Sequence, residues 1–190
     1  MKRLRELLLM GEHVCPWWLA YSFDNPFRRL IHPPEKVLAG LVLPGRTVLD
    51  IGCGMGHFTL GMARMVGSEG RVIALDLQER MLARVGKRAR KHGLTDRISL
   101  HRGTVESLGI RGGVDFALAF WMVHEVPDRP SFFQAVRGIL GENGRFLVAE
   151  PVIHVSAPAL RQSVEAALAS GLRVHAEPHI PMSRSVLLGV

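Results

Sequence analysis

The stretch TVLDIGCGMGHFTLGMARMVG, residues Thr47–Gly67, decides the fold. Its apolar run at residues 48–51 is typical of a buried strand. The next apolar positions have the spacing of a helix that packs on a sheet, at Phe58, Leu60, Met62, Ala63 and Val66. Between strand and helix stand Gly52, Gly54 and Gly56, which lack a Cβ and let the backbone turn tightly and approach a ligand. The stretch therefore predicts a strand, a ligand-binding loop and a helix.

The glycine spacing indicates which ligand the loop binds. A dinucleotide fingerprint has the spacing G-x-G-x-x-G and places the pyrophosphate at the helix N-terminus. Here the spacing is G-x-G-x-G, and Asp50 lies at the end of the strand. A carboxylate at that place repels a pyrophosphate but can reach an ammonium group. The loop therefore favours a ligand with an amino group and no phosphate, and a Rossmann dehydrogenase is the rival interpretation.

Composition limits the class of protein. The 190 residues suffice for one domain with a substantial core. Only two cysteines are present, Cys15 and Cys53, which predicts a reducing, cytoplasmic location. No apolar run approaches the roughly 20 residues that span a bilayer, so no membrane partner is expected. The net charge of +7 raises the alternative of a nucleic-acid partner, but the basic run Arg84–Lys91 is typical of a solvated helix face.

After the glycine loop, strand and helix patterns alternate, which is the signature of a parallel α/β sheet. Further strands are expected at Arg71–Asp76, Arg97–Gly103, Val114–Phe120, Arg145–Pro151, 172–180 and 182–190. Helices are expected at 78–93, Ser131–Leu140 and Ser156–Gly171, with a short turn or helix near Val105–Leu108. The last two strands are separated only by Pro181 and its neighbours, too short a link for a parallel crossover. They therefore form an antiparallel hairpin, and one strand of the sheet is reversed.

Residues 1–45 lie outside this alternating pattern. Aromatic residues concentrate there and are broken by prolines: Trp17, Trp18, Tyr21, Phe23 and Phe27. We expect residues 1–45 to cover the ligand-binding end of the sheet as part of the same domain, with residues 46–190 as the cofactor-binding core. Ordinary core packing of these aromatic residues is the alternative.

The order of glycine loop, acidic second strand, apolar fourth strand and terminal hairpin resembles the class I S-adenosylmethionine-dependent methyltransferases. The resemblance is carried by VLDIGCGMG and by Asp76 at the end of the second strand. It is closest to the group that includes the quinone-biosynthesis and arsenite methyltransferases. It implies a Rossmann-like, doubly wound sheet of seven strands, mostly parallel, with one antiparallel strand in the C-terminal hairpin.

The resemblance also implies how S-adenosylmethionine is bound. Asp76 would accept both ribose hydroxyls, and Asp50 with the glycine loop would hold the methionine part. Thr104 stands where relatives often have an aspartate that contacts the adenine, and the backbone N–H of Val105 could meet the ring. The complete set of expected cofactor residues is Asp50, Gly52, Gly54, Gly56, Asp76, Leu77, Thr104, Val105 and Phe120.

The segment after the fourth strand, WMVHEVPD, resembles the Trp-x-x-His-Asp segment of some small-molecule O-methyltransferases, in which the histidine is the base. His124 is accordingly the candidate catalytic base, because histidine titrates in the useful pH range. Packing or helix capping is the alternative role for this residue. Trp17, Trp18, Trp121 and Glu150 are candidates for contact with the methyl acceptor.

One further cluster combines two parts of the chain. Glu150 and His154 follow the fifth strand and could meet His13 and Cys15 of the N-terminal segment. These residue types can bind metals, but no tight ligand spacing supports a site, and none is predicted. Hydrogen bonds among these groups or to the acceptor are expected instead.

The sequence thus predicts a cytoplasmic S-adenosylmethionine-dependent methyltransferase that acts on a small apolar or aromatic molecule. No Asn/Asp-Pro-Pro-aromatic motif follows the fourth strand, which disfavours methylation of exocyclic base amines. Two alternatives remain: an RNA methyltransferase, suggested by the basic charge, and a protein that binds S-adenosylmethionine without transferring its methyl group.

Overall fold

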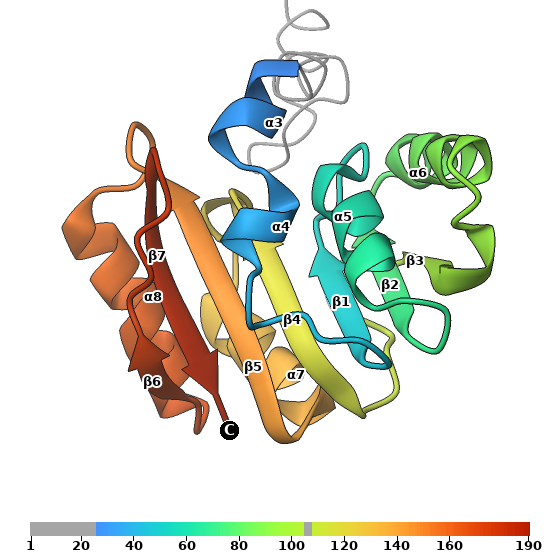
Figure 1. Cartoon of the computed structure of the whole chain (residues 1–190). Helices are drawn as coiled ribbons and strands as arrows, with labels where there is room; N and C mark the ends of the chain where they lie inside the picture. Colours follow the sequence, from blue (N-terminus) through green and yellow to red (C-terminus); the bar gives the residue numbers. More distant parts are fainter. Residues whose placement is uncertain (1–25, 105–107) are drawn as a thin grey trace, which may run out of the picture.

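The computed structural model describes residues 26–104 and 108–190 and contains one sheet of seven strands (Figure 1). The predicted sites at Trp17, Trp18 and Val105, and at His13 and Cys15 of the cluster, lie outside these residues. The strand order is β3-β2-β1-β4-β5-β7-β6. The strands are β1 (Thr47–Ile51), β2 (Arg71–Asp76), β3 (Ile98–Arg102), β4 (Val114–Phe120), β5 (Leu140–Pro151), β6 (Arg173–Ala176) and β7 (Ser183–Gly189).

Strand β7 is the reversed strand that the short link at Pro181 predicts. It pairs antiparallel with β5, where Val148 lies opposite Val186, and antiparallel with β6. Strands β1 to β5 pair in parallel wherever they are neighbours. The predicted α/β class, with a mostly parallel sheet and one antiparallel strand in a C-terminal hairpin, is confirmed.

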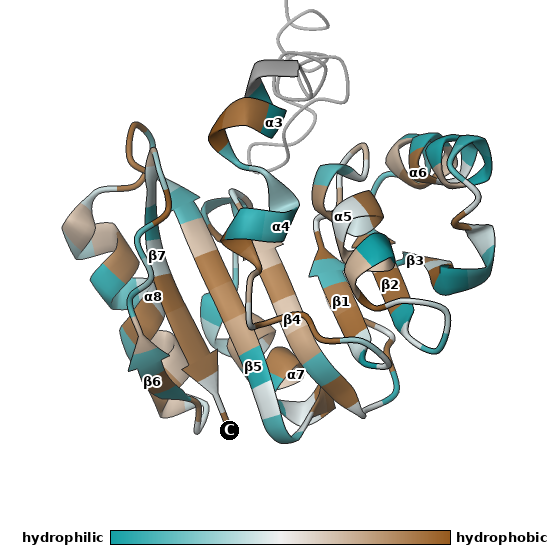
Figure 2. Cartoon of the chain, viewed as in Figure 1, coloured by the Kyte–Doolittle hydropathy of each residue, from teal (hydrophilic) through white to brown (hydrophobic). Residues whose placement is uncertain are grey.

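Helices cover both faces of the sheet. The helices are α3 (Pro26–Ile31), α4 (Pro34–Val37), α5 (His57–Met65), α6 (Glu79–Lys91), α7 (Arg129–Ile139) and α8 (Ala157–Ala169), with short 3-10 helices η1 (Thr95–Arg97) and η2 (Val123–Glu125). Helices α4, α5 and α6 pack on one face, where Phe58 and Leu60 belong to the same buried cluster as Phe116 and Leu118. Helices α7 and α8 pack on the other face. The central strands are accordingly hydrophobic and the outer side of α6 is hydrophilic (Figure 2).

Several element boundaries differ from the sequence prediction; β6, for example, ends at Ala176, although the strand was expected to reach residue 180. Helix α7 begins at Arg129 rather than Ser131, because the carboxylate of Asp128 accepts a hydrogen bond from the Ser131 N–H and caps the helix. Strand β5 begins at Leu140, because Leu140 already pairs with Val114 before a register shift, although the glycine-rich GENG segment was expected to lie outside the strand. The predicted Ser156 cap of α8 is confirmed by its hydrogen bond from the Ala159 N–H.

In Figure 1, α3 lies above the sheet and α4 lies in front of the upper end of β4, where the parallel strands have their carboxyl ends. Leu38 and Val42, which follow α4, are buried in the same core as Phe58 of α5. For residues 26–45, this packing supports our proposal that residues 1–45 form one domain with residues 46–190. Among the described residues, no helix is long and apolar enough to cross a membrane.

We expect Gly61→Ala to loosen the contact between α4 and α5. A Cβ at Gly61 would lie 2.3 Å from Cβ of Pro34, which forces one helix to move. The substitution should lower the free energy of unfolding by about 1–3 kcal/mol, the usual cost of overpacking. Gly138→Ala in α7 is the matched control, because its Cβ would meet nothing within 4 Å and alanine favours a helix. Denaturant unfolding checks both variants, and equal stability of the two would contradict this prediction.

Candidate cofactor and acceptor site

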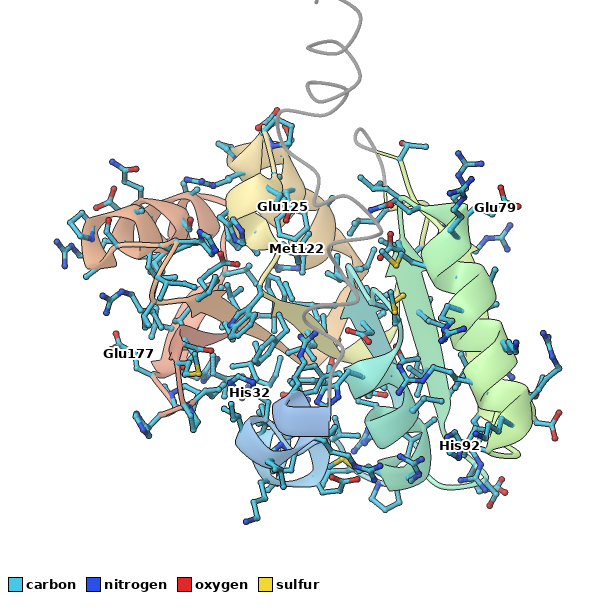
Figure 3. The ribbon with its side chains drawn as sticks, turned by 90° about the horizontal axis from the view of Figure 1, so that it is seen from above. His32, Glu79, His92, Met122, Glu125 and Glu177 are labelled. Atoms are coloured by element: carbon cyan, nitrogen blue, oxygen red, sulfur yellow. The ribbon has the colours of Figure 1, made fainter. Side chains whose placement is uncertain are left out.

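The candidate site lies where the strand order reverses. The chain leaves β1 toward β2 on one side, whereas β4 lies on the other side of β1. Ligands of open α/β sheets bind outside the carboxyl ends of the strands at such a point. Figure 3 views this edge from above: His32 lies beside α3 and α4, and Met122 and Glu125 lie across the sheet edge from it.

The glycine loop is held to β2 by its backbone. The N–H groups of Gly52 and Cys53 both donate to the carbonyl of Leu75, at 2.9 and 3.0 Å. The three glycines of the loop all have positive φ angles, of 68°, 51° and 84° in chain order, which disfavour other residue types. A Cβ at Gly52 would lie 3.0 Å from the Met122 side chain, whereas a Cβ at Gly54 would meet nothing within 4 Å. The loop is therefore packed at Gly52 and open at Gly54.

Asp76 connects this loop to the end of β2. One carboxylate oxygen accepts a hydrogen bond from the Gly54 N–H at 3.0 Å, and the other accepts from the Gln78 N–H at 2.9 Å. The side chain is buried, and burial raises the pKa of Asp76 although both hydrogen bonds favour the charged form. A carboxylate has about four lone-pair sites, so at least one is left for a ligand donor beside the backbone hydrogen bonds that Asp76 accepts. Leu77 follows Asp76 and is partly buried.

Asp50 is more deeply buried than Asp76, with 3% of its surface exposed. Its carboxylate accepts a hydrogen bond of 2.5 Å from the Thr59 hydroxyl on α5. Burial raises the pKa of Asp50 to about 7, while this hydrogen bond and the nearby Arg28 cation oppose the rise. A ligand cation close to Asp50 would favour the charged form of this carboxylate.

Because the pKa of Asp50 is raised, we expect the Asp50→Asn substitution to stabilise the fold more at about pH 7 than at about pH 4. Because the folded-state pKa lies above the unfolded value, the charged form destabilises the fold, and this penalty grows as pH rises from about 4 to 7. The penalty is at most about 4 kcal/mol, since each pKa unit corresponds to about 1.4 kcal/mol. Urea unfolding of both proteins at several pH values measures the difference. A difference that stays constant across this range would contradict the prediction.

An aromatic cluster lies at the carboxyl end of β4. Phe120 is buried and contacts Phe58 and Trp121, with ring centroids 4.5 and 5.4 Å apart. The guanidinium of Arg28 lies 5.5–5.9 Å from all three ring centroids, within the range of a cation–π interaction. Trp121 has a φ of 60°, and its indole N–H donates to the Ser183 hydroxyl. Strain of this kind in a non-glycine residue is typical of functional sites.

The His124 imidazole is held by a buried carboxylate. Its Nδ1 lies 2.5 Å from Oε2 of Glu150, whose side chain is 2% exposed. The same carboxylate accepts backbone hydrogen bonds from Val123 and His124, so Glu150 fixes η2 as well as the ring. The hydrogen bond to Glu150 raises the pKa of His124. Nε2 of His124 faces away from Glu150 and lies 4.0 Å from Glu125.

The structure brings together most of the predicted residues that it describes. Asp50, Asp76 and the glycine loop lie at the same carboxyl edge of the sheet as Phe120, Trp121 and His124. Thr104 is exposed, two residues beyond the end of β3. His154 stacks on His124 with ring centroids 6.1 Å apart, and within 26–104 and 108–190 no three potential metal ligands gather.

Sequence reasoning did not identify three participants in the site. Thr59 lies on the first turn of α5, and its position nine residues after Asp50 could have indicated the contact. Arg28 and His32 come from the segment expected to cover the site, but no spacing relates them to Phe120 or Trp121. Their contacts depend on how α3 and α4 pack, which local sequence patterns do not encode.

Comparison with known families identifies the chain. The family described as "Methyltransferase domain" matches residues 43–179. The chain belongs to this methyltransferase-domain family. Its fold is that of the class I S-adenosylmethionine-dependent methyltransferases, as the sequence predicted, and S-adenosylmethionine is the cofactor of that class.

Individual relatives are similar over part of their length. A demethylmenaquinone methyltransferase of Lactobacillus johnsonii is 29% identical over 70% of this chain and 52% of its own. The aklanonic acid methyltransferase of Streptomyces sp. strain C5 is 32% identical over 70% of this chain and 59% of its own. The chain thus spans about half the length of the curated relatives it matches.

Solved structures share the fold. An S-adenosylmethionine-dependent methyltransferase from Aquifex aeolicus superposes with a TM-score of 0.84 over 93% of this chain and all of the other, at 22% identity. Aeropyrum pernix fibrillarin, solved with natively bound S-adenosylmethionine, has a TM-score of 0.62 at 18% identity, over 81% of this chain and 72% of its own. At these identities the similarity describes the fold alone.

Proposed function

We propose that this protein transfers the methyl group of S-adenosylmethionine to a small apolar or aromatic molecule. The observation that carries the proposal is the position of the aromatic cluster Phe58, Phe120 and Trp121 at the carboxyl edge of the sheet. The glycine loop and its partner Asp76 lie on the adjacent strands of the same edge. A cofactor held by the loop would thus have an apolar, aromatic surface beside it.

The residues present fit this cofactor. The carboxylate of Asp76 can accept a hydrogen bond from a ribose hydroxyl, and the open side of Gly54 lets a ligand approach the backbone. Asp50 can attract the ammonium group of the methionine part, directly or through water. Two buried carboxylates beside the loop disfavour a pyrophosphate, which speaks against a dinucleotide at this site.

When bound, the cofactor supplies an electrophilic methyl group, and in-line transfer depends largely on alignment with the acceptor atom. The chain's own residues would contribute alignment and proton removal. Nδ1 of His124 is hydrogen-bonded to Glu150. Nε2 is therefore the ring nitrogen that can take a proton from the methyl-accepting molecule. Glu150 would act as the positioning residue for this base, a role in addition to its predicted contact with the acceptor.

The names of relatives support the acceptor class. Those with about 30% identity are described as methyltransferases of demethylmenaquinone, of 2-phytyl-1,4-naphthoquinone and of aklanonic acid. All three names denote small organic molecules. We therefore propose a small aromatic acceptor for this chain. We also propose a cytoplasmic location, which the low number of cysteines supports.

RNA methylation is the second candidate, and one observation favours it. Helix α6 exposes five cations on its outer side: Arg80, Arg84, Lys87, Arg90 and Lys91. Binding of RNA through these cations would weaken steeply with salt, because neutralised phosphates release counterions. The helix lies against β2 and β3, away from the aromatic cluster at the end of β4. The small-molecule acceptor is therefore preferred.

Methyl-labelled S-adenosylmethionine tests these candidates. The purified protein is incubated with a panel of phenols and hydroquinones, and separately with total RNA at low and high salt. We expect label in at least one aromatic acceptor and none in RNA. Label in RNA with strong salt dependence would contradict the preferred function. Binding of the cofactor without label in any fraction would indicate a protein that transfers nothing.

A further inference from the structure

His32 is a buried histidine beside the aromatic cluster, in the segment between α3 and α4. Only 1% of its surface is exposed. Its ring contacts those of Phe120 and Trp121 edge to face, with centroids 5.0 and 5.2 Å apart. His32 thus forms part of the surface that the proposed function assigns to the methyl acceptor.

The hydrogen bond of His32 fixes its tautomer. Nε2 lies 2.7 Å from the carbonyl oxygen of Pro181. A carbonyl oxygen only accepts, so Nε2 carries the proton, and Nδ1 of the neutral ring is a bare acceptor. Nδ1 is buried and has no hydrogen-bond partner in the described structure. A buried acceptor without a partner is costly, and a hydrogen-bond donor on a ligand would remove this cost.

The surroundings of His32 keep the ring neutral. Burial lowers its pKa, and the nearby Arg28 cation acts in the same direction, against the hydrogen bond to Pro181. A neutral ring with a free lone pair attracts a hydrogen-bond donor and repels a carboxylate. The Arg28 side chain lies over Phe120 and Trp121 and would have to leave these rings for a ligand to approach.

We propose that Nδ1 of His32 accepts a hydrogen bond from a hydroxyl group of the methyl acceptor. This inference rests on the proposed function and narrows its substrate class to hydroxyl-bearing aromatic compounds, such as phenols and hydroquinones. The aromatic rings of Phe120 and Trp121 would contact the body of the acceptor, and His32 would select the hydroxyl. Its place is distinct from that of His124, which comes from η2 across the sheet edge (Figure 3).

Two probes of equal size test this proposal: 2-naphthol, which has a hydroxyl donor, and 2-methylnaphthalene, which does not. Their dissociation constants are measured by titration calorimetry in the presence and absence of saturating S-adenosylhomocysteine. S-adenosylhomocysteine binding is recorded separately, so its absence would contradict the proposed function without deciding the role of His32. The ratio of the dissociation constants of 2-naphthol and 2-methylnaphthalene tests whether His32 binds the hydroxyl group.

Two variants separate the two ring nitrogens. In His32→Gln the amide can replace Nε2 and still donate to Pro181, but nothing replaces Nδ1. In His32→Asn the amide oxygen can replace Nδ1, while the bond to Pro181 is lost. The preference for 2-naphthol should fall about tenfold in His32→Gln and stay within about threefold of the wild type in His32→Asn. The same ratio in the wild type and His32→Gln, or binding of neither probe, would overturn the proposal.

Discussion

An Asp76→Ala variant should bind S-adenosylhomocysteine at least about 100-fold more weakly than the wild type. This corresponds to about 2.7 kcal/mol, because each tenfold change is about 1.4 kcal/mol. Two effects add up: the proposed acceptor for the ribose hydroxyls is lost, and the Gly54 and Gln78 N–H groups lose their partner. Titration calorimetry measures the affinity directly.

The control for this variant is Asp96→Ala, which removes an exposed carboxylate from η1. It should leave the affinity unchanged, so that loss of negative charge alone is excluded as the cause. Thermal unfolding of Asp76→Ala without ligand tests whether the variant is folded. A folded Asp76→Ala protein with wild-type affinity would show that the cofactor does not use this carboxylate.

Glu150→Gln should destabilise the fold by about 1–3 kcal/mol and lower the pKa of His124. The Glu150 carboxylate accepts from the Val123 and His124 N–H groups and from the His124 ring, and it is buried. The amide has one acceptor oxygen, so its NH₂ group must face at least one of these donors, and a buried donor without a partner costs about 1–3 kcal/mol.

The stability difference between Glu150→Gln and the wild type should depend on pH. Glu150 raises the folded-state pKa of His124, so the charged ring contributes stability below the unfolded pKa of about 6.5. This contribution is lost as pH rises through the folded-state pKa. The variant should therefore be destabilised more at about pH 5.5 than at about pH 8.5.

Glu125→Gln provides the matched control, because Glu125 lies 4.0 Å from Nε2 and contributes less to the pKa of His124. Proton NMR titration of His124 and denaturant unfolding check both variants. A His124 pKa that is unchanged in Glu150→Gln would contradict the assigned role of the carboxylate.

Local patterns predicted the part of the site that the chain builds continuously. Asp50, the glycine loop and Asp76 each follow or end a strand, and the carboxyl ends of parallel strands meet at one edge of the sheet. The reversed strand β7 was predictable for a similar reason, since a link as short as that at Pro181 excludes a parallel crossover. These features depend on chain geometry over a few residues.

The remaining features depend on tertiary packing. Glu150 was expected to contact the acceptor, but its burial beneath η2 depends on how β5 lies beside β4. The contact of His32 with Pro181 joins residues 149 positions apart. Strand β5 begins early, at Leu140, because Leu140 pairs with Val114. This pairing overrides the weak strand preference of the glycine-rich segment that follows. No local periodicity carries this information.

The destination of a labelled methyl group distinguishes methylation of a small molecule from the alternatives. The protein is incubated with methyl-labelled S-adenosylmethionine and a cell extract separated into small-molecule, RNA and protein fractions. We expect label in the small-molecule fraction, in a hydroxyl-bearing aromatic compound, and loss of that label in Asp76→Ala. Label confined to RNA or protein, or no transfer by a protein that binds the cofactor, would contradict this expectation.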